Sequence, residues 1–147
     1  MKPMSETAHA PLVVESDRVE VSVPLRTEYF ATLRTIAASL GADAGFSIDE
    51  IDDLRLAISE VVSSLVDGDA GPDQRVEASF ALDGSGLSVT ITTDKRDTVI
   101  ELDGLAASIL DSVVDSYEID GARVTLVKLA SEAALTASDA GPTITEA

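Results

Sequence analysis

Few residues of this chain have side chains suited to nucleophilic or metal chemistry. It has no cysteine and a single histidine, His9. Disulfides, thiolate catalysis and cysteine metal sites are therefore excluded, and a histidine triad or zinc site would depend on one residue near the chain start. Carboxylates and hydroxyls remain. Among these, Glu60 and Ser64 are four residues apart, so on a helix they would share one face and could serve one ligand.

The elements that would position these residues follow from apolar periodicity. A two-residue alternation over residues 19–23 predicts a strand that ends at Pro24. A helix is then expected, with an N-cap at Thr27, an apolar stripe spaced by three and four residues, and a C-terminal glycine at Gly41.

The helix that would carry Glu60 and Ser64 has the strongest start signal. Ser47 and Glu50 have the spacing of a capping box, in which each side chain satisfies a backbone N–H group of the first turn. An apolar stripe follows for about five turns, until Gly68 and the Gly71-Pro72 pair end the helix.

The second half of the chain predicts two hairpins separated by a helix. The first hairpin joins alternating residues 76–82 and 87–91 through a turn at 83–86, and a short strand is expected near residues 98–101. A helix over 105–113 follows, and then a hairpin of residues 117–119 and 124–129 around an Asp120-Gly121 turn. Helices segregated beside a largely antiparallel sheet define an α/β two-layer sandwich.

Length and composition indicate one folded domain. The chain has 147 residues, 45% of them hydrophobic, which suits a single domain of ~150 residues with a real core. We expect flexible tails at 1–17 and 131–147 around a domain at 18–130, because both ends lack periodicity. No stretch has the character of a signal peptide or a membrane span, so a cytoplasmic location is the default expectation.

The net charge of −17 limits the partners that this protein can have. Phosphate binding depends on clustered Lys and Arg, so we expect no direct nucleic-acid contact and, for the same reason, no anionic membrane contact. Strong acidity can steer a protein toward a basic partner, although many acidic surfaces are simply solvated.

Residues 20–67 resemble the anti-sigma-factor serine kinases of the RsbW type, in the GHKL (histidine-kinase-like) ATPase superfamily. The resemblance lies in EVSVPLRTEYFATLRTIAASLG and FSIDEIDDLRLAISEVVSSLVDG, where the second-helix motif is Asp53, Leu54, Ala57 and Glu60. It implies a Bergerat-type fold, a mostly antiparallel mixed sheet covered on one face by about three helices. It also implies that Glu60 holds the catalytic base position, and that Ser64 replaces the Asn that holds magnesium.

The family's nucleotide loops are altered in this chain. Asp94 matches the aspartate that reads adenine, but both glycines of that loop are replaced within residues 93–97. Gly104 is what remains of the second glycine loop, and Asp103 before it would repel the phosphates that the loop should hold. Only residues 98–102 are left for the lid over ATP. We therefore expect that the chain has retained the fold of the family but has lost its ATPase activity, and that it binds no cofactor. ATP and Mg²⁺ would be its cofactors only if the site is still active.

The resemblance implies a homodimer that sequesters a sigma factor until an anti-anti-sigma protein of the STAS type displaces it. Arg34 matches the first-helix arginine that contacts partners in the family, although it could equally be an exposed residue near Glu28 or Asp43, worth ~0–1 kcal/mol. The leading hypothesis is an anti-sigma-factor-like binding protein. The alternatives are an active ATP-dependent serine kinase that phosphorylates the anti-anti-sigma protein, and a domain that only dimerises with a catalytic paralogue.

Overall fold

The computed structural model describes residues 17–66, 73–94 and 99–131. Its elements follow one another as β1 (Arg18–Pro24), a 3₁₀ turn (Thr27–Tyr29), α1 (Phe30–Asp43), α2 (Ile48–Val66), β2 (Arg75–Leu82), β3 (Gly86–Thr93), α3 (Gly104–Val113), β4 (Ser116–Asp120) and β5 (Arg123–Leu129).

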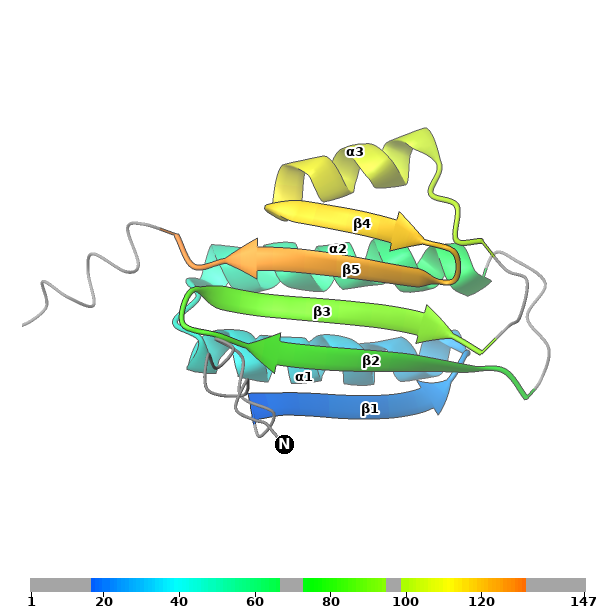
Figure 1. The fold of residues 1–147 in the computed structure, drawn as a ribbon, viewed down its shortest axis with the longest axis horizontal. Coiled ribbons are helices and arrows are strands. Elements are labelled where there is room, and N and C mark those ends of the chain that lie inside the picture. The colour runs from blue at the N-terminus through cyan, green and yellow to red at the C-terminus, as the bar shows by residue number, and fades with distance from the viewer. Residues whose placement is uncertain (1–16, 67–72, 95–98, 132–147) are drawn as a thin grey trace, which may run out of the picture.

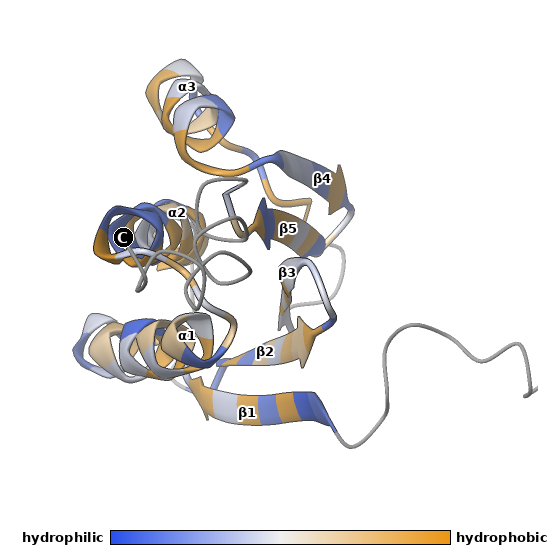
Figure 2. Ribbon diagram, turned by 90° about the vertical axis from the view of Figure 1, so that its left-hand side faces the viewer, coloured by the Kyte–Doolittle hydropathy of each residue, from blue (hydrophilic) through white to orange (hydrophobic). Residues whose placement is uncertain are grey.

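The five strands form one sheet in the order β1-β2-β3-β5-β4, and the three helices lie on one face of it (Figures 1 and 2). The α/β two-layer sandwich is therefore confirmed, and it is consistent with the GHKL-like ATPase fold of RsbW relatives. One detail of the expectation is corrected. All four strand pairings in the described residues are antiparallel, so the sheet is not mixed.

The core lies between the helix layer and the inner face of the sheet, where the apolar residues of each strand alternate with polar residues on the open face (Figure 2). Its largest fully buried side chains come from all three helices and from three strands. They include Leu33, Leu54, Ile58, Leu110, Val76, Phe80, Leu87, Val89, Ile91 and Leu126.

The end of α1 differs from the expectation. Gly41 is a buried helical residue, and a Cβ there would meet the Phe46 ring at 3.1 Å, so this glycine lets the next turn pack closely. The helix ends two residues later in a Schellman motif: Gly45 N donates to Ala42 O at 3.1 Å and Phe46 N to Gly41 O at 3.0 Å. Gly45, with φ +87°, supplies the left-handed conformation that the motif requires.

The start of α1 is also corrected. Thr27 does not cap an α-helix, because it begins the 3₁₀ turn and α1 starts only at Phe30, without a side-chain cap. The capping box of α2 is confirmed: Ser47 N donates to Glu50 Oε1 at 2.8 Å, and Glu50 N donates to Ser47 Oγ at 3.1 Å. The glycines expected to end α2 lie outside the described residues.

The strand expected near residues 98–101 does not form in its described part, 99–101. β5 lies beside β3, and Ile100 N of this segment donates to Gly121 O in the β4–β5 turn at 2.8 Å. The last hairpin turn is one residue later than expected. Asp120 pairs with Arg123, so Gly121, with φ +63°, and Ala122 form the two-residue loop.

The expected tails lie outside the described residues, except for Asp17 and Ser131. The division into a domain at 18–130 with flexible ends stays a prediction. Among the described residues, no helix is both long and apolar enough to cross a bilayer.

Candidate functional site

A cavity of about 220 Å³ lies where the C-terminal half of α2 meets the start of α3. Glu60, Ser63 and Ser64 line it from α2, Glu101 and Asp103 from the loop before α3, and Ala106 from the first turn of α3. The i, i+4 spacing therefore does place Glu60 and Ser64 on one face of a helix. It brings them beside the segment that contains Gly104, which itself is not among the lining residues.

The Ser64 hydroxyl is engaged by its own helix. Its Oγ donates to Val61 O at 2.6 Å, the back-bonding that serine adopts inside helices because its short side chain reaches the previous turn. Glu60 is half-buried one turn earlier on the same face. In this arrangement the serine oxygen keeps acceptor capacity toward the cavity while its proton is used by the helix.

Asp103 caps α3. Its backbone is extended, at φ −72° and ψ 174°, and its Oδ1 accepts from Ala106 N at 2.7 Å, as an N-cap aspartate does. The carboxylate thus occupies one of the N–H groups that the start of a helix can offer to a phosphate. A Cβ built on Gly104 would meet nothing within 4 Å and its φ is not left-handed, so the backbone does not require glycine there.

Asp94 lies apart from this cavity. It follows β3, and its exposed Oδ1 accepts from Arg75 N at 3.1 Å while its own N–H donates to Arg75 O at 3.4 Å. These contacts extend the β2–β3 pairing by one residue. Asp94 is not among the residues that line the cavity, so the structure does not bring it together with Glu60 and Ser64.

Arg34 contacts helix α2 of the same chain instead of an acidic neighbour. It is half-buried on α1, and its Nη1 lies 3.4 Å from Ser59 Oγ on α2. The carboxylate of Glu28 pairs with Arg26 at 3.7 Å. Arg34 is therefore held across the α1–α2 contact, and it is not among the residues that line the cavity.

The described lining of this cavity is acidic. Three of the six lining residues are carboxylates and none is Lys or Arg, so a polyphosphate would meet like charge. The volume of about 220 Å³ is below the ~300–1,000 Å³ of typical small-molecule pockets. Within the ranges that the structure describes, no group of three His, Cys, Asp or Glu residues could hold a metal ion.

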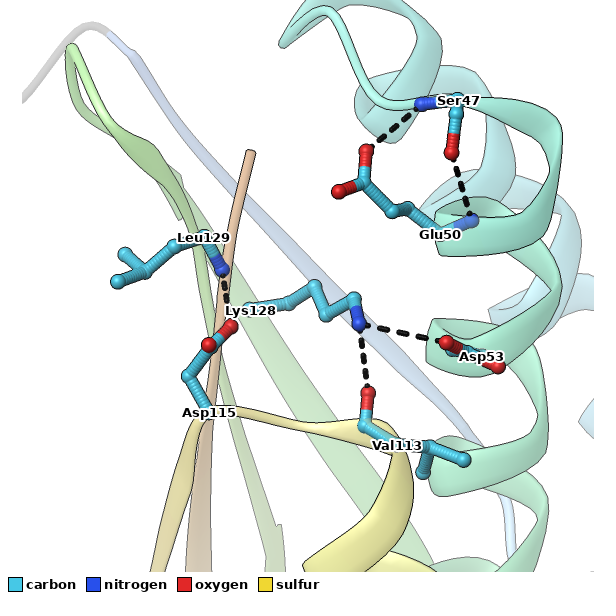
Figure 3. A network of polar contacts seen from close by, with 7 residues as sticks. All are labelled: Ser47, Glu50, Asp53, Val113, Asp115, Lys128 and Leu129. Carbon is cyan, nitrogen blue, oxygen red and sulfur yellow. Dashed lines mark hydrogen bonds and ion pairs between the residues drawn. The ribbon is translucent and has the colours of Figure 1, made fainter. Parts of the chain in front are cut away.

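A partly buried cation that is not among the site residues predicted from the sequence links three elements. Lys128 on β5 is 12% exposed, and its Nζ lies 2.8 Å from Val113 O at the end of α3 and 3.4 Å from Asp53 Oδ2 on α2 (Figure 3). The signal was present in the alternation of β5. Val124 and Leu126 point inward, so residue 128 must too, and a lysine there needs partners.

Glu50 is the buried carboxylate of the described residues, at 9% exposed. Burial by itself raises its pKa, but hydrogen bonds from the Ser47 backbone and from the side chain and backbone of Ser131 outweigh burial and leave the pKa below its ordinary value. The capping box therefore also ties α2 to the residues after β5.

No family model matches this chain. It is similar to the curated proteins named serine-protein kinase RsbW of Bacillus cereus, Bacillus thuringiensis and Bacillus anthracis. Each is 34% identical over 50 residues, which is 34% of this chain and 31% of the relative. The chain thus spans about a third of the length of the curated relatives that it matches. Fold and partial identity together support a distant relationship to the RsbW serine-protein kinases.

Proposed function

We propose that this protein is an anti-sigma-factor-like regulator that acts by protein contact, with ATP binding and kinase activity lost. The observation that carries the proposal is the Asp103 cap. Its carboxylate accepts a hydrogen bond from Ala106 N at 2.7 Å. This contact lies at the start of α3, where the resemblance to the RsbW-type kinases implies that phosphates would bind. A bound triphosphate would have to displace that hydrogen bond and approach Glu60 and Glu101 as well.

Two further residues support the loss of nucleotide chemistry. The Ser64 hydroxyl donates to Val61 O, and a serine oxygen is a shorter ligand than the amide that the family uses for magnesium. Asp94 is at the position that reads adenine in the family, and its carboxylate accepts a hydrogen bond from the backbone N–H of Arg75. Each change removes a different part of the site, so one reversal would not rebuild it.

The partners we propose are an alternative sigma factor, a STAS-type anti-anti-sigma protein, or both. They follow from the distant RsbW relationship, and a homodimer in the cytoplasm belongs to the same proposal. Arg34 is the proposed partner-binding residue. It is only half-buried, so part of its side chain is accessible to a partner, and arginine is common among interface hot spots.

Calorimetric titration of the full chain with ATP and Mg²⁺ tests the first half of the proposal. We expect no heat of binding at micromolar to millimolar nucleotide. Mixing the protein with purified candidate sigma factors and STAS proteins tests the second half, with a co-eluting complex as the expected result. Failure of every candidate to form a complex would refute the regulatory role.

A second candidate function is an active serine kinase with an unusual site. It is favoured by one observation, that Glu60 and Ser64 line the same cavity. Micromolar binding of Mg²⁺-ATP that is lost in Glu60→Ala and Ser64→Ala would establish this candidate over the first. A Glu77→Ala variant is the matched control, since Glu77 is exposed on β2 and lines no part of that cavity.

A further inference from the structure

The cavity between α2 and α3 carries charge of one sign. Glu60, Glu101 and Asp103 line it without a Lys or Arg. Within the described ranges, neither Glu60 nor Glu101 takes part in an ion pair. Glu60 is half-buried and Glu101 and Asp103 are exposed, so the three carboxylates give the cavity a negative potential that solvent partly screens. A cationic group entering the cavity would be attracted by that potential.

Two exposed apolar residues are close in sequence to residues that line the same cavity. The described part of the chain has five exposed large hydrophobic residues, and two of them, Val99 at 62% and Leu105 at 71%, fall in the seven-residue stretch that also supplies Glu101 and Asp103. Solitary exposed apolar residues are ordinary, but two beside an acidic hollow give a surface with both components of a protein interface.

The size of the cavity indicates what can enter it. A volume of about 220 Å³ has room for several water molecules, and therefore for a side chain of a partner. The protein as a whole has a net charge of −17, so long-range attraction also favours a positively charged partner.

We propose that this cavity and the adjacent Val99 and Leu105 form a docking surface for a basic amphipathic segment of a protein partner. One Lys or Arg side chain of that segment enters the cavity between Glu60 and Glu101, and its apolar side chains pack on Leu105 and Val99. The inference rests on the proposed function, since it names the chemistry of the partner that such a regulator would bind. The altered nucleotide site is then a receptor for a side chain.

The test uses the full chain and a labelled 18-residue probe peptide of Leu and Lys at amphipathic helical spacing, followed by fluorescence anisotropy at 150 mM salt. We expect binding that weakens at least tenfold in the double variant Glu60→Gln, Glu101→Gln and in Leu105→Ser. The matched controls remove the same charges or the same apolar group elsewhere, and we expect them to stay within twofold. These are Glu77→Gln with Glu118→Gln on the open sheet face, and Ile48→Ser at the other end of α2.

Equal weakening in both double variants would mean unspecific attraction to an acidic protein and would overturn the inference. So would equal binding of a peptide with the same composition but scrambled spacing, or no binding of the amphipathic peptide. Light scattering of the same variants identifies a different occupant. If Glu60→Gln with Glu101→Gln dissociates a dimer of this chain, a second copy fills the cavity and the inference is wrong.

The two proposals fail separately. A sigma factor or STAS protein that binds the Glu60→Gln, Glu101→Gln variant as tightly as the natural chain would overturn the docking surface and leave the regulatory role standing. Specific peptide binding without a complex among the candidate proteins would keep the docking surface and overturn that role.

Discussion

Glu50 links the start of α2 to the end of the sheet through one buried carboxylate. Its hydrogen bonds to Ser47 and Ser131 favour the charged form strongly enough to lower its pKa despite burial. A carboxyl whose pKa is lower in the folded state binds fewer protons there than in the unfolded state. Its stabilising effect is therefore present in full above the unfolded pKa and is lost as the pH falls through the folded pKa.

Replacement of Glu50 by Gln should remove this pH dependence. At pH 7 we expect Glu50→Gln to be less stable than the natural chain by about 1 kcal/mol, because an amide keeps the cap geometry but loses the charge-assisted bonds. The difference should shrink as the pH falls through the lowered pKa of Glu50, because the natural carboxyl then also becomes neutral. Urea unfolding at pH 7 and at pH 3.5 measures both values, and a difference that does not change with pH would contradict the assignment.

Asp103 should matter to α3 as a cap. Asp103→Ala removes the acceptor of Ala106 N and should lower the free energy of unfolding by about 1 kcal/mol, whereas Asp103→Asn should keep most of it. Amide exchange of Ala106 measures the local effect and urea unfolding the global one. Equal loss in the two variants would show that the charge, and not the cap, stabilises the helix.

The helices and hairpins themselves were largely predictable, because their apolar periodicity is regular. Their ends were less so. Gly41 and Gly45 are four residues apart and either could end the helix by its residue type, but Gly45 has the left-handed φ while Gly41 packs against Phe46 inside the helix. Likewise, the position of Asp103 indicates a negative charge near the expected phosphates, but an Asp before an apolar run is also an N-cap signal. The convergence of Glu60 with Glu101 depends on how α3 packs on α2, which no local pattern encodes.

Lys128 holds β5, α2 and α3 together, so its loss should cost more than the loss of its acidic partner. Lys128→Ala leaves the partly buried Val113 O without its donor and should lower the unfolding free energy by about 1–3 kcal/mol. Asp53→Asn should cost about 0–1 kcal/mol, since Asp53 is 41% exposed and solvent screens the pair. Urea unfolding of both variants checks the order, and a larger effect of Asp53→Asn would contradict it.

The β3–β5 pairing depends on a glycine. A Cβ on Gly86 would lie 2.3 Å from Lys128 O and 2.8 Å from Leu129 Cα, so the two strands would have to separate locally. We expect Gly86→Ala to lower the unfolding free energy by about 1–3 kcal/mol or more. Gly84→Ala, in open space within the same turn, is the control and should be nearly neutral in a thermal unfolding experiment. Similar losses in both variants would contradict the steric explanation.

The charge of the whole molecule bears on the rate at which it finds its partner. With a net charge of −17, association with a basic protein should be accelerated by electrostatic steering. Because the screening length falls from ~10 Å at 0.1 M salt to ~3 Å at 1 M, the association rate should fall by about tenfold or more over that range. Stopped-flow mixing with the basic probe peptide, or with a sigma factor that has been found to bind this protein, measures the association rate. A rate that is independent of salt would argue against steering.

The register of the sheet places the two ends of the described domain on the same side. Arg18, at the start of β1, shares a rung with Ala81, Ser88 and Val127, and three strand spacings of ~4.8 Å separate the first from the last of these residues. Ser131 then meets Glu50 at the start of α2, whereas the cavity begins ten residues further along that helix, ~15 Å away. A fusion partner or fluorophore attached beyond either end is therefore connected to the domain away from the cavity. A circular permutant that joins residues 131 and 17 by a short linker, and opens the chain at the Asp83–Gly86 turn, would keep α2 and α3 continuous for binding studies.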